Sequence, residues 1–519
     1  MAFVPVIVGV ADIKNKTDLH KEPATLMLEA IHSAIQDSGA SKSQVTSQID
    51  SIDVVRTWTW PYADLPGLLS QRLQLASKPK WSHYTATHGG NQPAKLVDEA
   101  AGRIARGTST VAVVTGGEAL ASLTACAKLG VTEPRGWTKP ETPVHDVFSP
   151  STADLGQDIG GMHSIGAPIH VYPLYENAFR AHREQTPRQN HDESATLYAD
   201  FAAVSAQHTY SWNHAKQPLS KDDIATVSPK NRMICSPYPL LMNAFNTVNL
   251  AAACILTSTE NAKKLGIPED KWVYPLGGAG RKEEEQFWRR PNFFQSQAIS
   301  LALDECLAIS DLTIDEIDAL DLYSCFPIVP KLACHHLGLP LSPSSKPLTL
   351  LGGLTSFGGA GNNYSMHAIT EMTRQIRNGK FQNGLVLANG GVLSYQHALS
   401  LSSNPRRHDS PYPDSRINSD AVVAGQTPVI ETFAEGAAVI ETYTVEFDRD
   451  GKPETAFIIG RLETTGHRFV ANHGDERTLL QISSALEEQV GKKGHVAVER
   501  SIGGKPERNL FFLALKPGL

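Results

Sequence analysis

Residues 88–117 read HGGNQPAKLVDEAAGRIARGTSTVAVVTGG, and residues 357–391 read FGGAGNNYSMHAITEMTRQIRNGKFQNGLVLANGG. Each stretch runs from a Gly-Gly pair through an asparagine and an amphipathic segment to a short apolar run that ends in a second Gly-Gly pair. Apolar residues recurring at three and four positions predict a helix, and the bounded apolar run predicts a strand. Because the pattern returns about 270 residues later, the chain contains a duplicated unit.

The duplication extends upstream of both stretches. Residues 26–55 and residues 299–323 each predict an amphipathic helix followed by a strand. Strands that alternate with helices predict buried, mostly parallel sheets that are covered by those helices. The sequence therefore predicts an α/β fold of two duplicated, layered halves that pack against each other.

The repeat also sets the domain boundaries. We place the first half at residues 1–275 and the second at residues 276–415. Residues 121–240 interrupt the first half with Pro, Trp and His in irregular order, so we interpret them as an inserted loop domain. Its one clear helix is predicted at 192–208, with Asp192 as the N-cap. Residues 242–258 then return to the first half as a buried helix or strand.

A β-rich domain is predicted over residues 425–519. Residues 429–447 alternate between apolar and polar at period two, and Asp450-Gly451 supplies a hairpin turn before further strand-like runs. One helix at 476–491 and a last strand at 509–515 could close a small barrel. Since this segment contains no catalytic motif, we expect it to cover an edge or the cleft of the other domains rather than to react.

Composition excludes several classes of protein. The 519 residues exceed what one hydrophobic core usually supports. The 47 basic and 54 acidic residues give a formal net charge of −7, and no Lys/Arg block supplies a face for nucleic acid. The apolar runs are shorter than the roughly 20 residues of a membrane span. We therefore expect neither a nucleic-acid partner nor a membrane span.

Targeting signals and cysteine usage predict an intracellular protein. The N-terminus lacks the features of a signal peptide, and the final KPGL does not match the Ser-Lys-Leu peroxisomal address. The six Cys contain no Cys-x-x-Cys pair and are typical of reduced thiols. We expect a cytoplasmic rather than a peroxisomal location.

Several ordered segments carry a family resemblance. They are GGNQP at 89–93, VVTGGEAL at 113–120, DLYSCFP at 321–327, GGLTSFGGAGNNYSMHAI at 352–369 and ANGGVLSYQHALS at 388–400. Together they resemble the thiolase superfamily over roughly residues 1–410. The branch called thiolase-like protein type 1 is similar in also carrying an additional C-terminal domain. The resemblance implies layered, duplicated α/β halves, a coenzyme A thioester as ligand, and a place in lipid metabolism.

The same resemblance shows which catalytic groups are missing. A working thiolase has a nucleophilic Cys where this chain has Gly90, and an oxyanion-hole His in a Gly-His-Pro motif where it has Gly359. The second catalytic Cys aligns at about Ala388, within one position. The family's Asn-Glu-Ala-Phe or His-Asp-Cys-Phe motif aligns with Tyr323–Phe326, where only the Cys and the Phe are retained. Thiolysis needs a thiolate, an oxyanion hole and a second thiol, so ordinary turnover should be absent or very slow.

Three residues are candidates for catalysis. Cys325 ends a predicted strand at the implied cleft, although a free Cys is more often a small buried hydrophobe. His88 precedes the empty nucleophile position and could act as a base or donate to a thioester oxygen, or it could pack at a strand end. His367 lies on the repeated helix of the second half, where a helix-interior His is more often structural.

Other polar residues are weaker candidates. Asn91, Asn362 and Asn363 could hold a carbonyl oxygen, but we expect them to cap the two repeated helices. His397 is a reserve candidate for the pocket. The run Cys334–His336 has metal-ligand residue types, but neighbours on a helix point about 100° apart and cannot converge on one zinc ion, so no metal site is predicted.

Two hypotheses for the function remain. The first is an acyl-CoA-binding acyltransferase of the acetyl-CoA acetyltransferase type that works without the usual cysteines. The alternative is a noncatalytic acyl-CoA-binding or scaffold protein derived from a thiolase. Both predict coenzyme A or an acyl-CoA as a ligand, with no permanently bound cofactor, in a pocket kept roomy by small residues at 89–90 and 358–360. The sequence is compatible with a homo-oligomer but does not indicate one.

Overall fold

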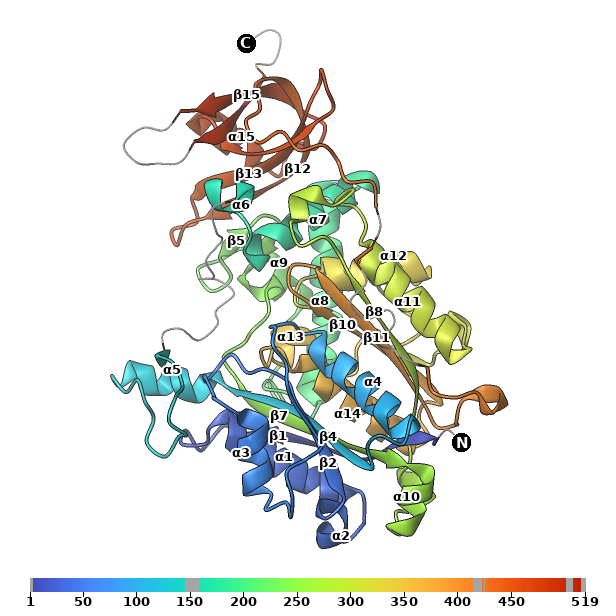
Figure 1. Ribbon diagram of the computed structural model, residues 1–519. Coiled ribbons are helices and arrows are strands. Elements are labelled where there is room, and N and C mark those ends of the chain that lie inside the picture. The colour runs from blue at the N-terminus through green and yellow to red at the C-terminus, as the bar shows by residue number, and fades with distance from the viewer. Residues whose placement is uncertain (1–2, 145–157, 414–421, 424, 501–506, 515–519) are drawn as a thin grey trace.

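Two sheets and the helices around them form the body of the protein (Figure 1). The structure is a computed structural model that describes residues 3–144, 158–413, 422–423, 425–500 and 507–514. The first sheet has the order β1 (Pro5–Lys14), β7 (Asn249–Ser258), β4 (Val111–Ala119), β2 (Ile49–Val54) and β3 (Trp81–Tyr84). The second has the order β8 (Tyr274–Lys282), β11 (Tyr395–Ser402), β10 (Asn383–Gly390) and β9 (Ala319–Leu322).

The sheets are mixed, which corrects the prediction of mostly parallel sheets. In each half one strand, β7 or β11, runs against all the others and lies between two of them. Both of its pairings are therefore antiparallel, while β2 with β4 and β9 with β10 pair in parallel. Residues 249–258 of the ambiguous segment are a fully buried strand, β7.

The repeat is confirmed as a helix and strand in each half. Helix α4 (Gln92–Ala105) leads into β4, and helix α14 (Tyr364–Arg377) leads into β10. These two helices contact each other and strands of both sheets, so they form the layer between the sheets. Helices α1 (Pro23–Asp37) and α11 (Gln297–Ser310) cover the outer faces. The two halves thus meet along α4 and α14, and β8 spans the boundary placed at residue 275.

The inserted region is more regular than predicted. It contains α5 (Leu120–Lys128), α6 (Ile159–Met162), α7 (Pro168–His182), α8 (Pro187–Gln207) and α9 (Lys221–Ala225). Helix α8 begins before Asp192, so the predicted N-cap is wrong. Thr186 caps the helix in a capping box with Gln189, and Pro187 takes the first helical position. The sequence Thr-Pro-Arg-Gln carried that signal.

The C-terminal strands close into a five-stranded barrel. The strands are β12 (Gly436–Phe447), β13 (Pro453–Leu462), β14 (Arg468–His473), β15 (Lys493–Glu499) and β16 (Arg508–Leu513), with α15 (Glu476–Ile482) between the third and fourth. Strand β12 pairs with both β13 and β15, which closes the barrel. Gly451 adopts a positive φ of 81° in the predicted hairpin turn. A small barrel with this arrangement resembles the OB-fold.

The barrel is docked on the inserted region. Strand β5 (Met233–Cys235) pairs with β12, so the two parts share one sheet. Arg180 of α7 forms an ion pair with Glu488 and donates to the Tyr443 hydroxyl at 3.1 Å. Arg468 of β14 is fully buried and donates to the carbonyl oxygen of Trp288 at 2.9 Å. The domain therefore packs against α7 and the segment after β8.

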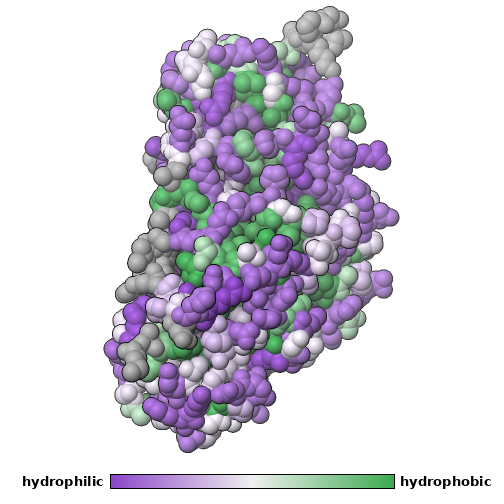
Figure 2. Space-filling model, turned by 90° about the vertical axis from the view of Figure 1, so that its right-hand side faces the viewer, coloured by the Kyte–Doolittle hydropathy of each residue, from purple (hydrophilic) through white to green (hydrophobic). Residues whose placement is uncertain are grey.

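On the face seen in Figure 2, hydrophobic side chains gather mainly between the two ends of the molecule and are bordered by polar ones. None of the helices that the structure describes is both long and apolar enough to cross a membrane.

Candidate functional site

His88 and Cys325 lie together in a cavity of about 710 Å³ where α4 and α14 begin. This volume is typical of small-molecule sites. Both halves and the inserted region contribute to its wall, which is formed by Trp58, His88–Gly90, Gly166–Ile169, Tyr172, Asn243, Ala244, Asn246, Glu285, Tyr323, Cys325, Phe326, Leu354, Gly361, Asn362, Asn389–Val392, Ser394 and Tyr395. No described residue of the C-terminal domain lines it.

Cys325 is a neutral thiol in this cavity. The side chain is 9% exposed, and its Sγ accepts a weak hydrogen bond from Nδ2 of Asn389 at 3.7 Å. Burial raises the pKa of Cys325 to about 12, and hydrogen bonds from Tyr172 and Asn389 offset only part of this. Because the thiolate is the nucleophilic form, Cys325 has little nucleophilic character near pH 7.

His88 is held as a neutral imidazole by Asn362. The Asn362 Oδ1 accepts from the Gly89 N–H at 2.9 Å, and its Nδ2 donates to the Arg56 carbonyl at 2.8 Å, which fixes the orientation of the amide. The same Nδ2 lies 2.9 Å from Nδ1 of His88, so Nδ1 must accept and the ring proton sits on Nε2. Burial, and then the Arg56 charge, lower the pKa of His88 to about 4.

The position where a thiolase nucleophile would stand is already occupied. A Cβ added at Gly90 would fall against the Tyr323 hydroxyl and 2.5 Å from the Asn389 carbonyl oxygen. The prediction of open space at this glycine is therefore wrong. Gly90 is small because the phenol of Tyr323 approaches its backbone.

Residues 358–360 do not line the cavity, which corrects the second part of that prediction. Gly358 has a φ of 120° and faces Val248, and the space beside Gly359 holds the carboxamide of Asn246. The loop therefore packs under the segment before β7. The next two residues, Gly361 and Asn362, reach the cavity instead.

Asn91 and Asn363 occupy the N-cap positions of α4 and α14, but their side chains make no capping bond. Nδ2 of Asn363 donates to the Gly116 carbonyl at 2.8 Å, and the Asn91 carboxamide lies against Gly390. Each asparagine thus reaches the Gly-Gly end of the other half's strand. The expected capping role is wrong because both side chains cross the junction between the halves.

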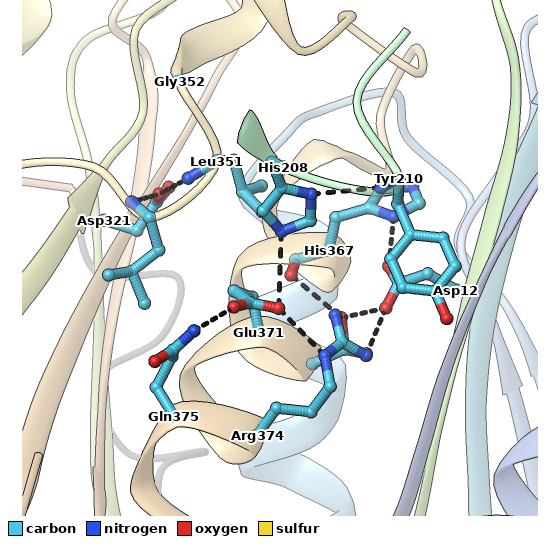
Figure 3. A network of polar contacts seen from close by, with 12 residues as sticks. Asp12, His208, Tyr210, Asp321, Leu351, Gly352, His367, Glu371, Arg374 and Gln375 are labelled. Atoms are coloured by element: carbon cyan, nitrogen blue, oxygen red, sulfur yellow. Dashed lines mark hydrogen bonds and ion pairs between the residues drawn. The ribbon is translucent and has the colours of Figure 1, made fainter. Parts of the chain in front are cut away.

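His367 lies outside the cavity wall, within a buried charge network (Figure 3). Its Nδ1 lies 2.5 Å from Oδ1 of Asp12 on β1, and Arg374 reaches the other Asp12 oxygen at 2.7 Å. Burial alone would raise the pKa of Asp12, but Arg374, His367 and Thr370 together hold it well below its usual range. The cavity lies at the start of α14, whereas position 367 faces β1.

The other candidate histidines are engaged elsewhere. His397 is buried and pairs with Asp98 at 3.1 Å, away from the cavity. His335 packs edge-on against Phe179, and His336 pairs with Asp304 at 2.7 Å. Cys334 is 1% exposed, so the three side chains of this run have separate surroundings.

Sequence reasoning missed Tyr172, Asn246 and Asn389 as cavity residues. The Tyr172 hydroxyl donates to the Gly391 carbonyl at 3.0 Å and accepts from Nδ2 of Asn389 at 2.8 Å. Asn389 directly follows Ala388, the residue aligned with the second catalytic Cys. Since that alignment is accurate to one position, it pointed to the neighbourhood of Asn389. Tyr172 lies on α7, a helix that the sequence analysis did not predict, and Asn246 lies in a loop, so neither was marked by a pattern.

A buried ion pair lies behind the cavity wall. Lys331 of α12 (Ile328–Leu337) and Glu176 of α7 are both fully buried, and their charged atoms are 2.6 Å apart. The Tyr238 hydroxyl donates to Glu176, and Asn190 accepts from Lys331 at 2.8 Å. Glu176 lies one helical turn after Tyr172, so the pair fixes the helix that carries a cavity residue.

Comparisons with known proteins agree with this architecture. Residues 419–500 match the family model of the thiolase-like protein type 1 additional C-terminal domain. The crystal structure of a monomeric SCP2-thiolase-like protein type 1 from Mycobacterium smegmatis has 32% identity and a TM-score of 0.80, over 98% of this chain and 99% of that chain. No curated protein sequence is significantly similar to this chain.

More distant structures share the fold of the two halves. Acetyl-CoA acetyltransferase from Syntrophomonas wolfei has 16% identity and a TM-score of 0.55, over 78% of this chain and 100% of that chain. Human mitochondrial 3-ketoacyl-CoA thiolase has 13% identity and a TM-score of 0.54, over 78% of this chain and 99% of that chain. With its duplicated halves, its docked barrel and a full-length relative at 32% identity, this chain belongs to the SCP2-thiolase-like protein type 1 family.

Proposed function

We propose that this protein binds coenzyme A thioesters, with the acyl end in the cavity between the two halves, and that it does not form a covalent acyl intermediate. The cavity itself carries the proposal. It is large enough for a thioester and short acyl group, and its wall combines apolar and aromatic side chains with polar groups that could orient a ligand.

The state of the polar groups argues against covalent capture. The Cys325 thiol has a pKa of about 12, and its sulfur accepts a hydrogen bond from the Asn389 amide rather than lying beside a base. His88 is neutral above about pH 5, and its Nδ1 already accepts a hydrogen bond from the Asn362 amide. A nucleophile normally needs an adjacent base or a lowered pKa. Binding without reaction is therefore the function that these groups support best.

Acyl transfer through Cys325 is the second candidate, because its thiol is part of the cavity wall. In such a step the sulfur would take the acyl group, the thioester bond to coenzyme A would break, and the thiol proton would pass to the leaving sulfur. Mass spectrometry of the intact protein after incubation with acetyl-CoA tests this candidate. An adduct lost in Cys325→Ala would establish transfer, and an unmodified mass supports binding alone.

Calorimetry with acetyl-CoA tests the binding proposal. Ala244 lies in the cavity wall, so Ala244→Trp should place an indole in the cavity and weaken acetyl-CoA binding. Ala437 is exposed on β12 of the barrel and is not a cavity residue, so Ala437→Trp is the matched control that should bind normally. Absence of heat and of any thermal shift with the unmodified protein at about 1 mM ligand would refute the proposal.

A further inference from the structure

Most polar side chains in the cavity wall already have hydrogen-bond partners in the protein. Asn389 donates to the Tyr172 hydroxyl at 2.8 Å and accepts from Gln396 at 2.6 Å. Asn362 uses both ends of its amide, as described above. The Ser394 hydroxyl accepts from Arg290 at 3.0 Å. These groups build the wall and have little hydrogen-bonding capacity left for a ligand.

Two cavity residues are exceptions. Among the residues that the structure describes, neither the Tyr323 hydroxyl nor the Asn246 carboxamide has a side-chain hydrogen-bond partner, and both line the cavity. Tyr323 is 6% exposed and Asn246 is half-buried, so the phenol is the more enclosed of the two side chains. Enclosed polar groups without a partner are uncommon in folded proteins and usually have a role that accounts for them.

The backbone is shaped around both side chains. The Tyr323 hydroxyl fills the space that a Cβ at Gly90 would need, and the Asn246 carboxamide fills the corresponding space at Gly359. Tyr323 follows β9 of the second half, whereas Asn246 precedes β7 of the first. The two halves thus each present one unpaired hydrogen-bonding group to the cavity.

We propose that Tyr323 recognises the acyl carbonyl of the bound thioester, its hydroxyl donating to the carbonyl oxygen, and that the Asn246 carboxamide binds a second polar atom of the same ligand. The inference rests on the proposed function and deepens it by naming the residues that distinguish an acyl thioester from coenzyme A alone.

The surroundings favour a neutral oxygen as the partner of Tyr323. No Lys or Arg is among the described residues that line the cavity, so an anionic group would lack a counter-charge there. Burial, and then the Cys325 sulfur, raise the pKa of Tyr323 well above its usual value, so the phenol keeps its proton and donates. A carbonyl oxygen accepts such a bond without carrying a charge into the cavity.

The test compares three ligands on two proteins by calorimetry: acetyl-CoA, its thioether analogue S-ethyl-CoA, which lacks the carbonyl, and free coenzyme A. Tyr323→Phe should weaken acetyl-CoA binding about two- to tenfold and leave S-ethyl-CoA and coenzyme A unchanged. Tyr364→Phe is the matched control, since its ring packs edge-on against Tyr323 at 5.6 Å but is not a cavity residue. Asn246→Ala should also weaken acetyl-CoA binding.

Each outcome has a distinct meaning. An unchanged acetyl-CoA affinity in Tyr323→Phe would overturn the inference and leave the binding proposal standing. An equal loss for all three ligands would also overturn it, because the residue would then be structural. If the unmodified protein bound none of the ligands, the proposed function itself would fail. A loss confined to the ligand that carries the carbonyl supports the assignment.

Discussion

Adding a single methyl group at Gly90 should destabilise the protein measurably. In Gly90→Ala the new Cβ would lie against the Tyr323 hydroxyl and 2.5 Å from the Asn389 carbonyl oxygen, well inside contact distance. Tyr323 can move only by disturbing its packing on Tyr364, and the carbonyl belongs to the buried strand β10. Overpacking of this kind costs about 1–3 kcal/mol, and we expect a loss in that range.

Urea unfolding, followed by circular dichroism, measures the effect as a lower midpoint with an unchanged slope. Gly102→Ala is the control in α4, the helix that follows Gly90, where the new Cβ would meet only the flexible end of Arg106, at 3.2 Å. Replacing an interior helix glycine by alanine usually stabilises by about 0.5–1 kcal/mol. If Gly90→Ala were as stable as the unmodified protein, the described contact between Tyr323 and the α4 start would be wrong.

Three further predictions concern buried groups. Cys325 should react with iodoacetamide at pH 8 far more slowly than an unfolded-chain thiol, since its pKa is about 12, and equal rates in native and urea-unfolded protein would contradict this. Lys331→Met should cost about 3–5 kcal/mol in urea unfolding because it leaves Glu176 charged and buried, and Lys331→Met with Glu176→Gln should recover most of the loss. Asp12 has a pKa below its ordinary value of 3.8, so its contribution to stability is complete above about pH 4 and is lost as the pH falls further. Asp12→Asn should therefore be less stable at pH 7, and its deficit should shrink below pH 4; a deficit that does not change with pH would refute the assignment.

Much of the fold could be predicted because its signals are local. The two Gly-Gly stretches, with the helices between them, identified the duplication, and period-two alternation identified the barrel strands. The direction of each strand could not be predicted in the same way. Nothing local in residues 249–258 or 395–402 states that β7 and β11 insert between strands that run the other way. Direction is set by the connections, which depend on tertiary packing.

The site was predicted less well, since its contacts join segments that are distant in the sequence. Asn362 bonds to the Gly89 N–H across 273 positions, and no spacing rule shows that the amide would cross rather than cap its helix. His88 and Cys325 were identified because they flank motifs with an aligned place at the cleft. Asn246 had no such motif, although its carboxamide accounts for the glycine at 359.

The glycines at positions 90 and 359 have a physical explanation that follows from their neighbours rather than from catalysis. In each case a side chain from another segment fills the volume that a larger residue would need. A phenol in place of a thiol changes the available chemistry, because a protonated hydroxyl donates a hydrogen bond but does not attack a carbonyl. The wall of this cavity of about 710 Å³ includes two donor or acceptor groups without side-chain partners among the described residues. An inert scaffold would not require a Tyr323 hydroxyl that faces the cavity without a side-chain partner, whereas recognition of a ligand oxygen would use it. This is the strongest physical reason to look for a bound thioester rather than for turnover.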